Sequence, residues 1–94
     1  MKIEEIRKKI SLVLKKYHIK KAGVFGSYAK TNQSKSSDID ILIELENTPS
    51  LLEFIRIKLE LETILKNKVD LVEYATLKPL LKNQILEEEI RIYG

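Results

Sequence analysis

Residues 23–45, GVFGSYAKTNQSKSSDIDILIEL, decide the fold of this chain. An apolar stretch ending at Phe25 is followed by Gly26-Ser27, which predicts an abrupt turn, and a second apolar run opens at Asp38-Ile39-Asp40. If the second run is a strand, its two aspartates point to one face and its isoleucines point to the other. The stretch therefore predicts two strands of one sheet, joined by a polar loop, with two carboxylates where the second strand begins.

Two carboxylates on one face of an apolar strand repel each other and resist burial. A bound divalent cation would offset both the repulsion and the cost of burial, because Mg²⁺ is bound through one or two carboxylates plus substrate phosphates. The alternative is that Asp38 and Asp40 simply begin the strand in solvent, since Asp is common in turns. The Gly26-Ser27 turn before these aspartates favours the cation site over a solvent-exposed strand start. Gly26 lets a phosphate approach the backbone, the Ser27 hydroxyl can donate a hydrogen bond, and a helix start behind them favours an anion.

The remaining elements follow from hydrophobic periodicity and turn residues. We expect helices over residues 2–17, 48–65 and 77–92, strands over residues 20–25, 38–43 and 68–72, and a short helix after the Gly26-Ser27 turn. Thr48 is expected to cap the second long helix, with Pro49 at its first helical position. Residues 1–94 then make one α/β (α+β) domain of order α-β-α-β-α-β-α, with helices packed on a small three-stranded mixed sheet.

The third predicted strand carries one more acidic side chain. With Val69 and Leu71 facing the core, Asp70 is turned toward the face that carries the two earlier aspartates. A lone Asp in a short apolar strand costs stability unless it is paired or bound to a metal. Glu44 alternates onto the same face but lies about 13 Å beyond Asp40 along the strand, so we expect it to be too far away to share a metal.

Composition narrows the class of protein. Hydrophobic residues at 44% and charged residues at 33% are typical of a globular domain. There is no cysteine and no apolar run of the ~20 residues that a membrane span needs, and the N-terminal MKIEEIRKKI is no signal peptide. We therefore expect a cytoplasmic protein that contacts no membrane. The net charge of +3 fits a basic rim around a triphosphate. Direct nucleic-acid binding is not expected, because no aromatic platform or helix-turn-helix spacing is evident.

A family resemblance is carried by these residues. Gly26-Ser27, ten intervening residues and Asp38-Ile39-Asp40 resemble the G-S-x10-D-x-D signature of the DNA-polymerase-β-like nucleotidyltransferases. The whole chain resembles the minimal nucleotidyltransferase family, the small partners of HEPN-domain toxins. Asp70 matches the third carboxylate of that family. One departure is Lys30-Thr31, where members often have Arg-Gly, so the positive charge is retained but the glycine is lost.

The resemblance implies an enzyme, a metal-dependent nucleotidyltransferase that moves AMP from ATP to a tyrosine of a cognate HEPN toxin and so acts as an antitoxin. It implies catalytic and metal-binding roles for Asp38, Asp40 and Asp70, with two Mg²⁺ ions ~3.5–4 Å apart. It also implies nucleotide binding by Gly26, Ser27 and Lys30, although a solvated side chain is the commoner explanation for a lysine such as Lys30. The alternative is a non-catalytic antitoxin that neutralises its toxin by binding. The clustered acids argue against that alternative, since a pure binder gains nothing from them.

Overall fold

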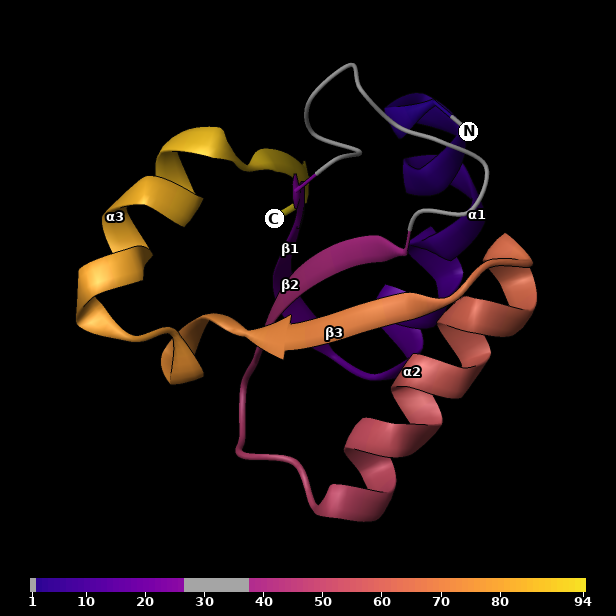
Figure 1. The fold of residues 1–94 in the computed structure, drawn as a ribbon. Coiled ribbons are helices and arrows are strands. Elements are labelled where there is room, and N and C mark those ends of the chain that lie inside the picture. The colour runs from indigo at the N-terminus through magenta and orange to yellow at the C-terminus, as the bar shows by residue number, and fades with distance from the viewer. Residues whose placement is uncertain (1, 27–37) are drawn as a thin grey trace.

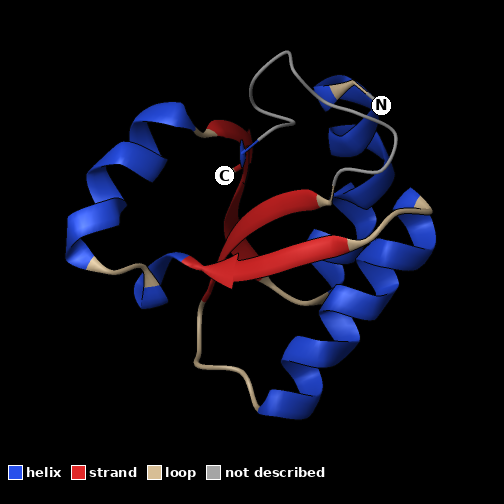
Figure 2. Cartoon of the chain, in the orientation of Figure 1, coloured by secondary structure: helices blue, strands red, loops and turns tan. Residues whose placement is uncertain are grey.

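The computed structural model describes residues 2–26 and 38–94 (Figures 1 and 2). The elements are α1 (Ile3–Lys16), β1 (Ile19–Phe25), β2 (Ile39–Leu45), α2 (Leu51–Leu65), β3 (Val69–Glu73), the 3-10 helix η2 (Tyr74–Thr76), α3 (Pro79–Glu88) and β4 (Ile90–Tyr93). None of the helices in this described part of the chain has the length and apolar content that a membrane span requires.

The strands form one mixed sheet in the order β3-β2-β1-β4. β1 pairs antiparallel with both β2 and β4, whereas β2 pairs parallel with β3. A parallel pair needs a crossover connection, and α2 supplies it. β2 therefore lies between β1 and β3, so a residue near the start of β2 has neighbours from two other strands.

The hydrophobic core lies on one face of the sheet, where α1 and α2 pack side by side (Figure 1). Apolar residues spaced three and four apart form the buried stripe of α1, as the periodicity predicted. The core contains side chains from every strand and both of these helices: Ile6, Ile10, Val13, Leu14, Ile19, Ala22, Val24, Ile39, Ile41, Ile43, Ile57, Leu61, Leu65, Val69, Leu71 and Ile92. The other face of the sheet is left for the candidate site.

The mixed α/β architecture confirms the predicted fold class, but the sheet has four strands and not three. The predicted final helix over residues 77–92 is wrong beyond Glu88. Glu89 has an extended backbone (φ −70°, ψ 149°), and Ile90–Tyr93 form β4 against β1. This pairing satisfies backbone groups at an otherwise open edge of β1 and buries Ile92.

The start of the second long helix also differs from the prediction. Thr48 and Pro49 precede α2, which begins at Leu51. Ser50 is the N-cap, because its Oγ accepts a hydrogen bond from the backbone N–H of Glu53 at 3.1 Å. The predicted short helix after Gly26 lies outside the described residues.

Candidate active site

Asp40 and Asp70 are direct neighbours in the sheet. Asp40 is half-buried near the start of β2, and its Cα partners are Asp70 on β3 and Phe25 on β1. Strands in a sheet are about 4.8 Å apart, so the two carboxylates lie within reach of each other. Asp38 is exposed and directly precedes β2. The structure thus brings together two of the three predicted acids from separate strands, with Asp38 two residues before Asp40.

The turn from α2 into β3 positions Asp70. Lys66 adopts the left-handed conformation (φ 53°) that ends α2. The backbone N–H of Val69 then donates to a carboxylate oxygen of Glu62 at 2.9 Å, and the N–H of Ile39 donates to the carbonyl of Lys68 at 2.9 Å. These bonds hold the first residues of β2 and β3 in one register, which sets Asp70 opposite Asp40.

Gly26 lies against the Asp40 carboxylate. It follows β1 with a positive φ of 71°, a conformation that glycine adopts at little cost. A Cβ atom on this residue would overlap Oδ2 of Asp40 and lie 3.1 Å from its Cγ. The Gly26 backbone and the carboxylate are therefore close enough to form one site. Ser27 and Lys30, the other two predicted nucleotide-binding residues, lie outside the described residues, so their roles stay predictions.

The charge on Asp40 is disfavoured. Burial raises the pKa of this carboxyl group to about 6, and the neighbouring Asp70, through its charge and a hydrogen bond, and then the charge of Asp38 contribute in the same direction. A divalent cation relieves such repulsion, and carboxylate oxygens are ligands that Mg²⁺ prefers. In residues 2–26 and 38–94 no group of three acidic, histidine or cysteine side chains is arranged to hold a metal ion. The pair fits an ion held by two carboxylates and completed by phosphates.

The raised pKa makes stability depend on pH. The folded-state value of about 6 exceeds the ordinary 3.8, so the folded protein holds this proton more tightly. The associated stability is fully present below about pH 4 and is lost as the pH rises through 6. In metal-free buffer above pH 7, we expect Asp40→Asn to have a free energy of unfolding about 1–2 kcal/mol higher than the wild type. This value already allows for the partial contact of Asp40 with solvent. Near pH 4 we expect the two proteins to be equally stable. Urea unfolding across this range measures the difference. A stability difference that does not change with pH would contradict the raised pKa of Asp40.

The same face of the sheet carries a network that sequence reasoning missed. The Tyr74 hydroxyl donates to Oε2 of Glu89 at 2.5 Å, and the Arg91 guanidinium donates to Oε1 of Glu89 at 2.9 and 3.2 Å. Both acceptor oxygens belong to a side chain that is 6% exposed. No local pattern joins these residues, because Glu89 stands at the end of a run of three glutamates and its partners lie on η2 and β4.

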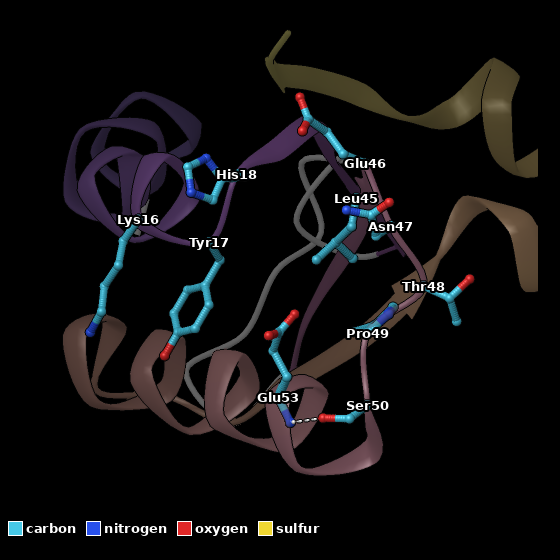
Figure 3. Close-up of a pocket in the computed structure, with 10 residues that line it drawn as sticks. All are labelled: Lys16, Tyr17, His18, Leu45, Glu46, Asn47, Thr48, Pro49, Ser50 and Glu53. Carbon is cyan, nitrogen blue, oxygen red and sulfur yellow. Dashed lines mark hydrogen bonds between the residues drawn. The ribbon is translucent and has the colours of Figure 1, made fainter.

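Two other features lie away from the carboxylates. Glu44 pairs with Lys21 at 3.9 Å, four residues along β2 from Asp40, consistent with its predicted exclusion from the site. A cavity of about 400 Å³ lies at the far end of β2, between the end of α1 and the start of α2 (Figure 3). It is lined by residues such as Tyr17, His18 and Glu53, and Leu45 at its edge is about 16 Å along the strand from Asp40. This cavity is not part of the carboxylate site.

Known proteins resemble this chain in sequence and in fold. Residues 8–94 match the family described as polymerase beta nucleotidyltransferase. The chain is 46% identical over 92 residues to a Methanocaldococcus jannaschii protein whose name places it among the protein adenylyltransferases, and the match covers 98% of this chain and 99% of that protein. The fold resembles, with a TM-score of 0.82 and 26% identity, a chain in the crystal structure of a toxin-antitoxin with AMP-PNP, covering 94% of this chain and 73% of that one.

A second solved structure shows the same fold. It is a tri-AMPylated Shewanella oneidensis HEPN toxin in complex with an MNT antitoxin, and the TM-score is 0.76. The likeness covers 97% of this chain and 71% of that chain, and at 22% identity it shows the fold alone.

Proposed function

The chain belongs to the polymerase β nucleotidyltransferase family, and from that membership we propose that it is a protein adenylyltransferase that transfers AMP from ATP to a tyrosine of a cognate HEPN toxin. The modified toxin is silenced, which makes this protein an antitoxin. The proposal treats residues 1–94 as one catalytic domain, because a single sheet and a single core account for the described residues.

The observation that supports this function most directly is the Asp40–Asp70 pair beside Gly26. Asp38 and Asp40, with Asp70 alongside, are the residues that would hold magnesium, and their mutual repulsion is a reason for the protein to bind a cation there. Bound magnesium would supply positive charge to the triphosphate and withdraw electron density from the phosphoryl group that is transferred.

The residues of the chain have distinct roles in the proposed reaction. Gly26 allows the phosphates to approach the backbone, and Ser27 and Lys30 bind their β/γ end. Asp70 orients the tyrosine hydroxyl of the toxin and accepts its proton. The hydroxyl oxygen forms a bond to the α-phosphorus, the bond from that phosphorus to the β-phosphate oxygen breaks, and pyrophosphate leaves with the electron pair.

The acceptor is proposed to be a protein for two reasons. The relative from Methanocaldococcus jannaschii is named among protein adenylyltransferases, and a chain of the same fold was solved as a toxin-antitoxin with a nucleotide analogue. The specific assignment to a HEPN toxin tyrosine follows the resemblance to the minimal nucleotidyltransferases.

A mass measurement tests the function. Purified protein is incubated with ATP, Mg²⁺ and the product of the neighbouring gene, the proposed HEPN toxin, and this product is weighed by intact mass spectrometry. We expect its mass to rise by whole AMP units, and peptide fragmentation should assign them to tyrosine. Reactions with EDTA or without ATP are the controls. A stable complex with unchanged mass would instead support neutralisation by binding alone.

A further inference from the structure

Helix α3 is only weakly packed against the body of the protein, because Ile85 and Leu86 are half-buried and its other residues are exposed. None of its residues is buried, whereas α1 and α2 each bury part of one face. Leu80 is 95% exposed and Leu81 is 50% exposed. Figure 1 shows α3 standing apart from the sheet, on the side away from α1 and α2. A helix of ten residues is marginal in water without tertiary contacts, so α3 needs stabilisation from another source.

The two ends of the α3 segment are fastened together. The Tyr74 hydroxyl, before the helix, donates to Glu89, after it, and Arg91 donates to the other oxygen of the same carboxylate. We call these three residues the clasp. Burial and the hydrogen bond to Glu89 raise the pKa of the Tyr74 hydroxyl, so it remains a donor at neutral pH. The clasp closes residues 74–89 into a loop and fixes where the helix starts and ends.

The clasp lies on the same face of the sheet as the carboxylates. A Cβ atom on Gly23 would be 2.9 Å from the Tyr74 hydroxyl oxygen and 3.0 Å from Cδ of Glu89, so the absence of a side chain there makes room for the clasp. Gly23 is the Cα partner of Leu42, which is two residues, about 7 Å, from Asp40 along β2. The end of α3 at Glu89 is therefore held near the site, and the helix extends from there.

The opposite face of the sheet is covered by α1 and α2 (Figure 1). A folded protein that brings a hydroxyl to Asp40 and Asp70 must therefore lie against the open face, and α3 borders that face. A weakly packed helix with two exposed leucines at this edge offers apolar contact area to a partner.

We propose that α3 is the acceptor-binding helix, whose Leu80 and Leu81 pack on an apolar patch of the acceptor protein beside the hydroxyl to be modified, and that the clasp positions this helix. The inference rests on the proposed adenylyltransferase function and adds the surface by which the acceptor is recognised. Burying these leucines adds tertiary contacts to the few that α3 has in the free chain.

The first test changes an exposed leucine. Leu80→Glu places a charge in the proposed interface, and Leu12→Glu is the matched control, because Leu12 is 76% exposed on α1, on the covered side. The acceptor probe is the proposed HEPN toxin of the mass experiment. We expect Leu80→Glu to raise both the Kd for this protein, measured by calorimetry without ATP, and the KM for it at least about tenfold, with kcat and ATP affinity unchanged. Leu12→Glu should match the wild type.

The second test removes one hydrogen bond of the clasp. Tyr74→Phe keeps the ring and loses the hydroxyl that donates to Glu89. We expect a KM for the acceptor raised about three- to tenfold at unchanged ATP affinity. A merely structural role would instead lower thermal stability with no change in this KM.

The outcomes separate this inference from the function on which it rests. Wild-type binding and transfer with an unchanged Kd and KM in Leu80→Glu overturn the acceptor-binding helix and leave the adenylyltransferase intact. Binding that Leu80→Glu weakens, without any AMP transfer by the wild type, supports the helix as the binding surface and overturns the catalytic function. Self-association of the wild type that Leu80→Glu abolishes assigns α3 to a second copy of the chain and overturns the inference.

Discussion

Replacing Asp40 with asparagine is expected to lower the rate of AMP transfer on the order of 10³-fold while the protein remains folded. The change removes the central member of the carboxylate cluster, the one with neighbours on both β1 and β3. It also removes the charge whose burial is unfavourable, so the free energy of unfolding should not fall. Single-turnover transfer at saturating ATP measures the loss in the chemical step.

Glu44→Gln is the matched control for this prediction. Glu44 lies on the same strand as Asp40 but pairs with Lys21, away from the carboxylate pair. The control should transfer AMP at close to the wild-type rate. A second readout is the thermal shift that ATP with Mg²⁺ produces, which should be large for the wild type and Glu44→Gln and small for Asp40→Asn. Undiminished transfer by Asp40→Asn would refute the proposed site.

Replacing Gly26 with alanine is expected to reduce transfer at least about 10²-fold and to destabilise the fold by about 1–2 kcal/mol. The positive φ of this residue is unfavourable for alanine, and the added Cβ would overlap the Asp40 carboxylate. The carboxylate must move, and small displacements of a reacting group have large effects on rate.

A control variant and a double-mutant cycle identify the cause of the reduced AMP transfer by Gly26→Ala. Gly94 also has a positive φ, of 86°, but it contacts Lys20 and Lys21 at the other end of β1. Gly94→Ala should therefore affect stability without an equal loss of transfer. In an Asp40→Asn background, Gly26→Ala should cause little further loss, because both changes act on one carboxylate. Fully additive losses would show that Gly26 acts independently of Asp40.

Much of the fold could be predicted from local patterns. The helical spacing of apolar residues gave α1 and α2 nearly to their ends, and the alternation in DIDILIEL gave β2 with its aspartates away from the core. The placement of Asp70 on the same face as Asp40 could be predicted as well, because two alternating strands with the same side buried present their remaining side chains to one face. The register that sets Asp70 directly opposite Asp40 could not be predicted from this alternation.

The missed elements depend on contacts between distant residues. The apolar spacing of Leu86 and Ile90 continues the helical pattern through Glu89, and neither glycine nor proline marks the break. What ends α3 is the pairing of β4 with β1 and the burial of the Glu89 side chain against Tyr74. Neither interaction is visible within a window of neighbouring residues. The choice of Ser50 over Thr48 as N-cap has no local marker either, because both residue types cap helices.

The crossover through α2 joins β2, which carries Asp40, to β3, which carries Asp70, and it affects the order of folding. β1 and β2 can pair early as antiparallel neighbours, but β3 reaches β2 only after the crossover through α2 has closed. Loop closure of this kind is entropically costly and makes parallel pairing slow. We therefore expect Asp40 and Asp70 to come together late during refolding. Recovery of enzymatic turnover should lag behind recovery of helical circular dichroism, so partly folded chains emerging from the ribosome would be inert toward ATP.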